Sequence, residues 1–236
     1  MAALARKTVV VTGSQGKVGR HVAAAFKRAG WLVVGVDLVR GIYDCPAHGD
    51  AFPEVYQQVD LCDAGSVFSV VARFRPAVVV HTAAIPDPTH NAPHEVLQKN
   101  TMATFNVVEA AVRFKVARVV YLSSEQVPGY FASERVVPAQ GASLGLPHYF
   151  PVDEAHPITP SNPYAVSKHF GELLCDAAVR RCAELSCVSI RPSWCQDESN
   201  IERNLGPLVR DPALGNEGAW RGVVWRGGVA CAHVCV

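Results

Sequence analysis

The sequence has almost no excess of charge of either sign. Its 22 Lys and Arg residues against 21 Asp and Glu residues leave a formal net charge of +1. Proteins that bind nucleic acid or an anionic membrane through electrostatics carry a basic face, and this composition gives no sign of one. No apolar run approaches the roughly 18 residues of a membrane-spanning helix. We therefore expect neither a nucleic acid nor a membrane as the partner.

A secretory leader and a disulfide framework are missing from the pattern as well. The first residues, MAALARKTVVVTG, enter a strand-like run almost at once, which leaves no room for a full signal or transit peptide. The eight cysteines form no CxxC pair, so we expect reduced thiols and no metal site. These features predict a cytoplasmic protein.

Short β-branched apolar runs alternate with helical segments along most of the chain. Continuous apolar strands separated by helices indicate a parallel sheet that is covered on both faces. The sequence therefore predicts an α/β protein with a Rossmann-like, doubly wound parallel sheet. The expected strands are 8–13, 31–37, 54–60, 77–84, 117–124 and 186–192, and the expected helices are 19–30, 64–74, 93–115 and 163–184.

A glycine-rich turn follows the first expected strand in VVVTGSQGKVGRHV. In such a turn, one glycine permits a tight bend, one lets backbone N–H groups approach a pyrophosphate, and one allows close helix–strand packing. The position between a strand and a helix is the context that this motif requires. The residues expected to bind a dinucleotide here are Gly13, Gln15, Gly16, Lys17, Val18 and Gly19.

Acidic residues end the second and third expected strands. Asp37 could accept both ribose hydroxyls of an adenosine and would repel a 2′-phosphate, which favours NAD over NADP, although a loop-capping role is the alternative. Asp60 and the adjacent Leu61 stand where contact with the adenine side is expected. Capping of the next helix is an equally good reading for Asp60 or Asp63.

A tyrosine and a lysine lie four residues apart in SNPYAVSK, so a helix would place Tyr164 and Lys168 on one face. A free tyrosine has a pKa of about 10 and is a poor base at neutral pH. We expect the lysine ammonium to lower that pKa and also to bind the nicotinamide ribose. The segment YLSSEQ supplies Ser123 and Ser124 as hydroxyl donors at the end of the fifth strand.

Taken in order, these motifs resemble the extended short-chain dehydrogenase/reductase superfamily, in its NAD-dependent epimerase/dehydratase branch. The resemblance covers roughly residues 7–220 and rests on TGSQGKVG, HTAA, NTMATFNVVEAA, YLSSEQVPG, PYAVSK and IRPSW. It implies NAD as cofactor, with Ala83 and Ala84 of HTAA against it. It also implies Asn100 as a support for the active-site water and lysine, and Ser124 as the catalytic hydroxyl beside Tyr164 and Lys168.

The implied activity is that of an NAD-dependent oxidoreductase or epimerase/dehydratase that acts on a hydroxyl or carbonyl of a carbohydrate-like substrate. The resemblance also implies a homodimer through the helices expected at 93–115 and 164–184. Two segments depart from the family pattern: Pro128 replaces the tyrosine of SSxxVYG, and CQDESN follows RPSW. Because nucleotide-sugar contacts in the family usually come from these regions, the resemblance does not by itself carry over a UDP-sugar, and a smaller hydroxy compound such as a free sugar acid or other carbohydrate is at least as good an expectation.

The C-terminal region departs from the family as well. We expect an NAD-binding domain over residues 1–192, the start of a substrate-binding lobe over 193–220, and an atypical tail over 221–236. The tail holds no Asp or Glu and has no amphipathic period. The resemblance implies a longer substrate-binding lobe, so we expect most of that lobe to be missing. The alternative function is therefore that of an NAD-binding form with weak or no catalysis.

Overall fold

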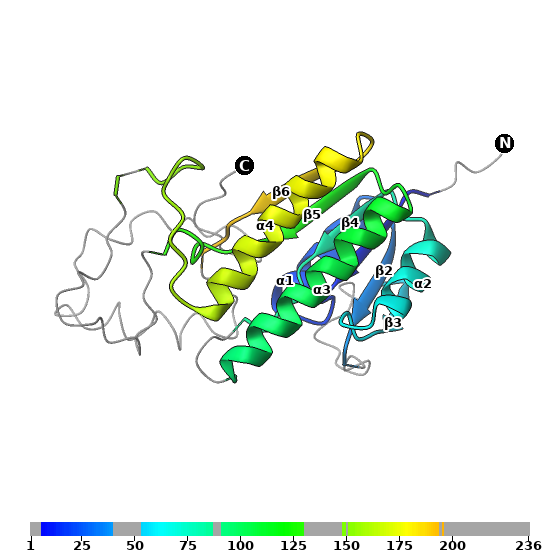
Figure 1. The fold of residues 1–236 in the computed structure, drawn as a ribbon. Helices are drawn as coiled ribbons and strands as arrows, with labels where there is room; N and C mark the ends of the chain where they lie inside the picture. Colours follow the sequence, from blue (N-terminus) through cyan, green and yellow to red (C-terminus); the bar gives the residue numbers. More distant parts are fainter. Residues whose placement is uncertain are drawn as a thin grey trace, which may run out of the picture.

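The computed structural model describes residues 6–39, 53–86, 91–129, 148–149, 151–193 and 195. In these ranges a parallel six-stranded sheet has the order β3-β2-β1-β4-β5-β6 (Figure 1). This order is that of a doubly wound dinucleotide-binding sheet and confirms the predicted fold class. The strands are β1 (Thr8–Thr12), β2 (Leu32–Asp37), β3 (Val55–Gln58), β4 (Val78–His81), β5 (Arg118–Leu122) and β6 (Ser186–Ile190).

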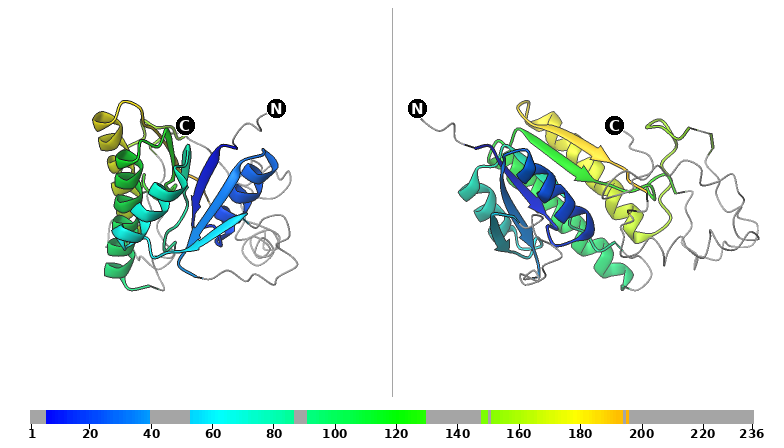
Figure 2. Two further views of the ribbon diagram at one scale, coloured as in Figure 1. Left: turned by 90° about the vertical axis from the view of Figure 1, so that its right-hand side faces the viewer. Right: turned by 180° about the vertical axis from the view of Figure 1, so that it is seen from behind.

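Helices cover both faces of the sheet. Helix α1 (Lys17–Arg28) packs on one face, and the other face carries the remaining helices (Figure 2). These are α2 (Ala64–Phe74), α3 (Pro93–Arg113) and α4 (Pro163–Arg181). The predicted helices correspond to the observed ones to within a few residues at each end, as end fraying leads one to expect.

The apolar runs of the strands are divided between two cores. Successive side chains of a strand point to opposite faces, so Val9 and Val11 lie against α1 while Val10 packs on the side of α2 and α3. Each of these valines is at most 2% exposed. Full burial of one such side chain stabilises the fold by roughly 1.5–3 kcal/mol. A run with apolar residues at every position is therefore what a sheet covered on both sides requires.

Polar caps fix where two of the helices begin. Asp63 accepts hydrogen bonds from the N–H groups of Gly65 and Ser66, at 3.2 and 3.1 Å, and so caps α2. Asn162 accepts one from the N–H of Ala165 at 2.8 Å, and Pro163 takes the first helical position of α4. This start places Tyr164 in the first turn of α4.

Several expectations fall outside the described ranges. The tail at 221–236 is among them, and so is the region 193–220 apart from Ser193 and Cys195. Among the residues that the structure describes, no helix combines the length and the apolarity needed to cross a membrane.

Candidate active site

A cavity of about 780 Å³ opens at the carboxyl ends of β1, β4 and β5. This is the crevice where the strand order reverses, between β1 and β4, which is the usual ligand site of an open α/β sheet. All of the residues predicted for the site line this one cavity. They are Gly13, Gln15, Gly16, Lys17, Val18, Gly19, Asp37, Asp60, Leu61, Ala83, Ala84, Asn100, Ser124, Tyr164 and Lys168.

The glycine-rich turn is packed too tightly for side chains. Gly13 has a φ of 68°, and a Cβ there would lie 2.7 Å from the backbone nitrogen of Ala83. A Cβ on Gly19 would lie 2.0 Å from the carbonyl oxygen of Gly13. The N–H of Gly16 closes the turn on that same carbonyl at 2.9 Å. The glycines thus bring the N-terminus of α1 to the cavity, where its N–H groups favour an anion.

Asp37 ends β2 and holds the glycine-rich turn. Its Oδ2 accepts a hydrogen bond from the N–H of Gln15 at 2.9 Å, and its Oδ1 accepts one from the N–H of Leu38 at 2.8 Å. The alternative prediction that Asp37 caps a loop is therefore correct for these two hydrogen bonds. Because Asp37 also lines the cavity, contact with a ribose stays a prediction compatible with that role.

The two acids after β3 have separate places. Asp63 is the cap of α2, whereas the Oδ1 of Asp60 accepts a hydrogen bond from the N–H of Cys62 at 2.8 Å. Asp60 and Leu61 form part of the cavity wall. Of the two alternatives for helix capping, the structure selects Asp63 and leaves Asp60 at the cavity.

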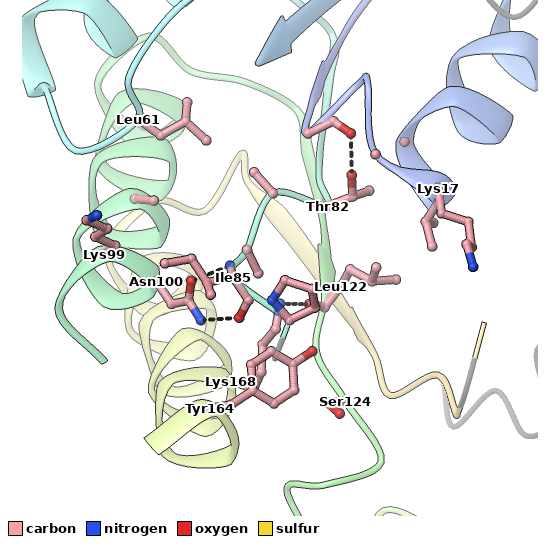
Figure 3. Close-up of a pocket in the computed structure, with 18 of the residues that line it drawn as sticks. Lys17, Leu61, Thr82, Ile85, Lys99, Asn100, Leu122, Ser124, Tyr164 and Lys168 are labelled. Atoms are coloured by element: carbon pink, nitrogen blue, oxygen red, sulfur yellow. Dashed lines mark hydrogen bonds between the residues drawn. The ribbon is translucent and has the colours of Figure 1, made fainter. Parts of the chain in front are cut away.

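Lys168 is buried beside the Tyr164 ring. Its ammonium donates a hydrogen bond to the carbonyl oxygen of Leu122 at 2.7 Å and lies 5.6 Å from the centroid of the Tyr164 ring (Figure 3). The side chain is 3% exposed, and burial lowers the pKa of Lys168 to about 7. The lysine can therefore hold or release a proton near neutral pH.

The pKa of Tyr164 differs from the sequence-based expectation. Burial raises the pKa of Tyr164 to about 12, and a side-chain hydrogen bond with Ser124 only partly opposes this rise. The predicted lowering is therefore wrong for this structure, because burial removes the phenolate from water and the nearby Glu125 and Cys195 side chains also disfavour it. Tyr164 is protonated at neutral pH, and its ring lies between Lys168 and Ser124 (Figure 3).

Asn100 lines the cavity and connects α3 with the end of β4 and with α4. Its Oδ1 accepts a hydrogen bond from the N–H of Ile85 at 2.8 Å, and its Nδ2 donates to the Ile85 carbonyl at 3.1 Å (Figure 3). The same Nδ2 lies 3.2 Å from the Oγ of Ser167, which donates to the Tyr164 carbonyl at 2.7 Å. Asn100 thus fixes the first turn of α4 relative to the end of β4.

Sequence reasoning missed a buried polar chain that crosses under the cavity. His81, 1% exposed, hydrogen-bonds through Nδ1 with the Thr12 hydroxyl at 2.7 Å and through Nε2 with the Thr104 hydroxyl at 3.1 Å. Burial lowers the pKa of His81 to about 3, so the ring is neutral. The available signal was a histidine at the end of an otherwise apolar strand.

Further cavity residues had no predicted role. Some of them extend the wall around Asp37 and Asn100, and others surround the hydroxyl of Tyr164. They include Leu38, Val39, Thr82, Ile85, Lys99, Glu125, Gln126, Ser193 and Cys195.

Two kinds of relative match this chain in sequence. It is 27% identical over 232 residues to UDP-glucose 4-epimerase 2 of Oryza sativa subsp. japonica, which covers 90% of this chain and 53% of the relative. It is 33% identical over 123 residues to methionine adenosyltransferase 2 subunit beta of Pongo abelii, which covers 51% of this chain and 33% of the relative. The chain spans about half the length of the first of these relatives.

A solved structure with the same fold is the Bordetella bronchiseptica enzyme WbmH in complex with NAD+. It superposes with a TM-score of 0.61 at 26% identity and covers 79% of this chain and 56% of that one. The sequence profile of the NAD dependent epimerase/dehydratase family matches residues 9–195, which include the glycine-rich turn, Asn100, Ser124 and the Tyr164–Lys168 pair. The chain therefore belongs to the NAD dependent epimerase/dehydratase family.

Proposed function

We propose that this chain binds NAD and acts as an oxidoreductase or epimerase on a hydroxyl or carbonyl of a carbohydrate-like substrate. One observation carries the proposal. A single cavity joins the glycine-rich turn and Asp37 to the Tyr164, Lys168 and Ser124 side chains. A dinucleotide site and a proton-transfer site are thereby continuous.

The residues present fit NAD. The close approach at Gly13 and Gly19 leaves backbone, rather than side chains, at the start of α1, which suits a pyrophosphate. A carboxylate at Asp37 suits the two hydroxyls of an adenosine ribose and opposes a 2′-phosphate. A cavity of about 780 Å³ lies within the size range of small-molecule and cofactor sites.

The protonation states of Tyr164 and Lys168 support the catalytic roles that we propose for them. When bound, the nicotinamide supplies a hydride acceptor and donor. Tyr164, which is protonated at neutral pH, is placed to give a proton to a substrate carbonyl and to take one back from an alcohol. The Lys168 ammonium is the cation that favours the phenolate in the second direction, and Ser124 orients the substrate oxygen.

The polar end of the cavity supports this substrate class. Near Tyr164 the cavity is lined by hydroxyl, carboxyl and amide side chains, which suit a polyhydroxylated compound. These residues are Ser124, Glu125, Gln126 and Ser193. The names of the relatives point to sugar nucleotides, whereas Pro128 and the segment after RPSW favour a smaller sugar or sugar acid.

We also propose a homodimer formed through α3 and α4. These two helices pack against each other, and large apolar side chains remain between 38% and 51% exposed on them. A second copy of the chain would cover them in a four-helix arrangement. The side chains are Leu97, Met102, Phe105, Val166, Phe170, Leu173 and Val179.

A second candidate is a nucleotide-binding protein without turnover. The observation that favours it comes from the relatives. One of the relatives is itself named as the subunit of a different enzyme. In this case NAD would bind, but substitution of Tyr164 would change no measurable rate.

The test is a screen of the whole chain for turnover, in which NADH absorbance detects net oxidation or reduction and chromatography of the substrate and product detects epimerisation, which leaves no net change in NADH. The compounds are UDP-glucose, free sugars and sugar acids, each measured with the parent chain and with Tyr164→Phe. Turnover that disappears in Tyr164→Phe supports the oxidoreductase. NADH binding without turnover in either protein supports the second candidate, and turnover that survives in Tyr164→Phe contradicts the proposed role of the phenol.

A further inference from the structure

A buried carboxylate lies one helical turn beyond Lys168. Glu172 is 9% exposed, and its Oε1 accepts a hydrogen bond from the Ser123 hydroxyl at 2.6 Å. Its two oxygens also accept from Nε and Nη2 of Arg191, each at 2.8 Å, and Oε2 lies 3.5 Å from Nδ1 of His169. Burial would raise the pKa of Glu172, but the hydrogen bonds from Arg191 and Ser123 lower it overall. The group is therefore a carboxylate at neutral pH.

These three residues, Ser123, Glu172 and Arg191, form what we call the Glu172 clamp. They come from three elements, because Ser123 follows β5, Glu172 belongs to α4 and Arg191 follows β6. The elements are neighbours in the fold (Figure 1). The two-pronged contact between a guanidinium and a carboxylate fixes direction as well as distance.

The clamp closes around the segment that carries Ser124. On the helix side, Lys168 donates to the carbonyl of Leu122 at 2.7 Å. On the strand side, the N–H of Ser123 donates to the Ile190 carbonyl at 2.7 Å, and the N–H of Glu125 donates to the Pro192 carbonyl at 3.1 Å. The Glu172 carboxylate joins these two sets of contacts, since it binds both the β5 end and Arg191.

We propose that Glu172 is a positioning residue that, through Ser123 and Arg191, holds the catalytic face of α4 at a fixed distance from Ser124. The proposal rests on the function proposed above for Tyr164, Lys168 and Ser124. Glu172 itself lies outside the set of side chains that line the cavity. It acts on the reacting groups by setting where α4 meets the end of β5.

A purely stabilising role is a poor explanation for this arrangement. Taking a carboxylate and a guanidinium out of water costs free energy that their attraction only partly returns, and a packed apolar pair often serves stability as well. An apolar pair would not fix the position of α4 relative to the end of β5 in the same way. A donor and acceptor set with three hydrogen bonds at 2.6–2.8 Å specifies one arrangement of the helix.

The protonation of Lys168 reports on this positioning. Burial lowers its pKa to about 7, and the aromatic and titratable groups around its ammonium are Tyr121 at 5.2 Å, Tyr164 at 5.6 Å and the neutral His81. If α4 moves away from β5, water reaches the ammonium and the pKa rises. If the only effect of substituting Glu172 were the loss of its negative charge, the pKa of Lys168 would fall, because a nearby negative charge favours the ammonium.

The experiment is an NMR titration of Lys168 in the whole chain without cofactor, with lysine labelled at the ε carbon. The Lys168 signal is assigned by its loss in Lys168→Met. The variants are Glu172→Gln, Arg191→Lys and the double change Glu172→Met with Arg191→Met. The matched control is Glu109→Gln, which breaks the ion pair between Glu109 on α3 and Arg181 on α4, away from the cavity.

We expect the pKa of Lys168 to rise by about one unit or more in the clamp variants and to stay near its parent value in Glu109→Gln. The double variant keeps the test decisive if Glu172→Gln does not fold. A folded clamp variant in which Lys168 titrates at or below its parent value would overturn the proposal. Failure of the proposed function would be distinguishable from failure of this proposal, because it would appear as a parent chain that does not bind NADH.

Discussion

Lys168→Met should make the protein more stable at neutral pH and change how its stability depends on pH. The Lys168 ammonium is almost fully buried, and its pKa falls from 10.5 in the unfolded chain to about 7 in the folded one. Between these two values the unfolded chain binds more protons than the folded chain. Stability therefore rises with pH across this window and is lost as pH falls toward 7.

The size of the effect follows from the two pKa values. A difference of about 3.5 units corresponds to roughly 5 kcal/mol at pH values well below 7, at about 1.4 kcal/mol per unit. From pH ~7 to pH ~9 the parent chain should gain about 2 kcal/mol in its free energy of unfolding from this group alone. Methionine carries no proton and fills a similar volume, so the variant should lack this gain.

Urea unfolding under reducing conditions measures the difference. With a slope of about 2 kcal/mol per molar urea, the midpoint of the parent chain should move up by about 1 M between these pH values, and that of Lys168→Met should move much less. Other groups titrate in both proteins, so the decisive quantity is the difference between the urea midpoint of the parent chain and that of Lys168→Met as pH changes. Parallel curves would refute the argument that Lys168 is held at a cost to stability.

Three further predictions concern the site and the assembly. Tyr164→Phe should lower kcat by about 10²–10⁴-fold and leave the Kd for NADH almost unchanged, as steady-state rates and a binding titration would show, because only the proton transfer is lost; full turnover would contradict this. Asp37→Ala should narrow the preference for NADH over NADPH and weaken NADH binding itself by about 10-fold or more, since the Gln15 N–H loses its acceptor; an unchanged ratio of Kd values would show that Asp37 does not select the cofactor. Leu173→Glu should give a monomer by analytical ultracentrifugation where the parent chain gives a dimer, because the new charge would be buried between the two copies of the chain in the proposed dimer. A parent chain that stays monomeric at micromolar concentration would contradict the dimer.

The sheet and the dinucleotide loop could be read from local patterns. TVVVTG holds three consecutive valines because both faces of β1 are covered, and the glycines that follow have spacings that only a tight turn needs. The Tyr164–Lys168 pair was equally accessible, since residues four apart share a helix face. Each of these features depends on neighbours in the sequence.

The features that local patterns did not give depend on residues far apart in the chain. The Ser123–Glu172 and Thr12–His81 contacts join residues 49 and 69 positions apart, so no spacing rule finds them. The pKa of Tyr164 was predicted in the wrong direction for a related reason. The sequence shows the lysine that favours the phenolate, but it does not show how much water burial removes from the phenol.

A fluorescence titration of the whole chain with NADH and, in parallel, with NADPH decides whether the cavity is a site for NAD. We expect saturable binding of NADH with an affinity about 10-fold or more above that for NADPH, because the Asp37 carboxylate and the backbone of the glycine-rich turn both line the cavity and would meet the ribose and the pyrophosphate. Absence of saturable NADH binding, or equal affinity for the two nucleotides, would contradict it.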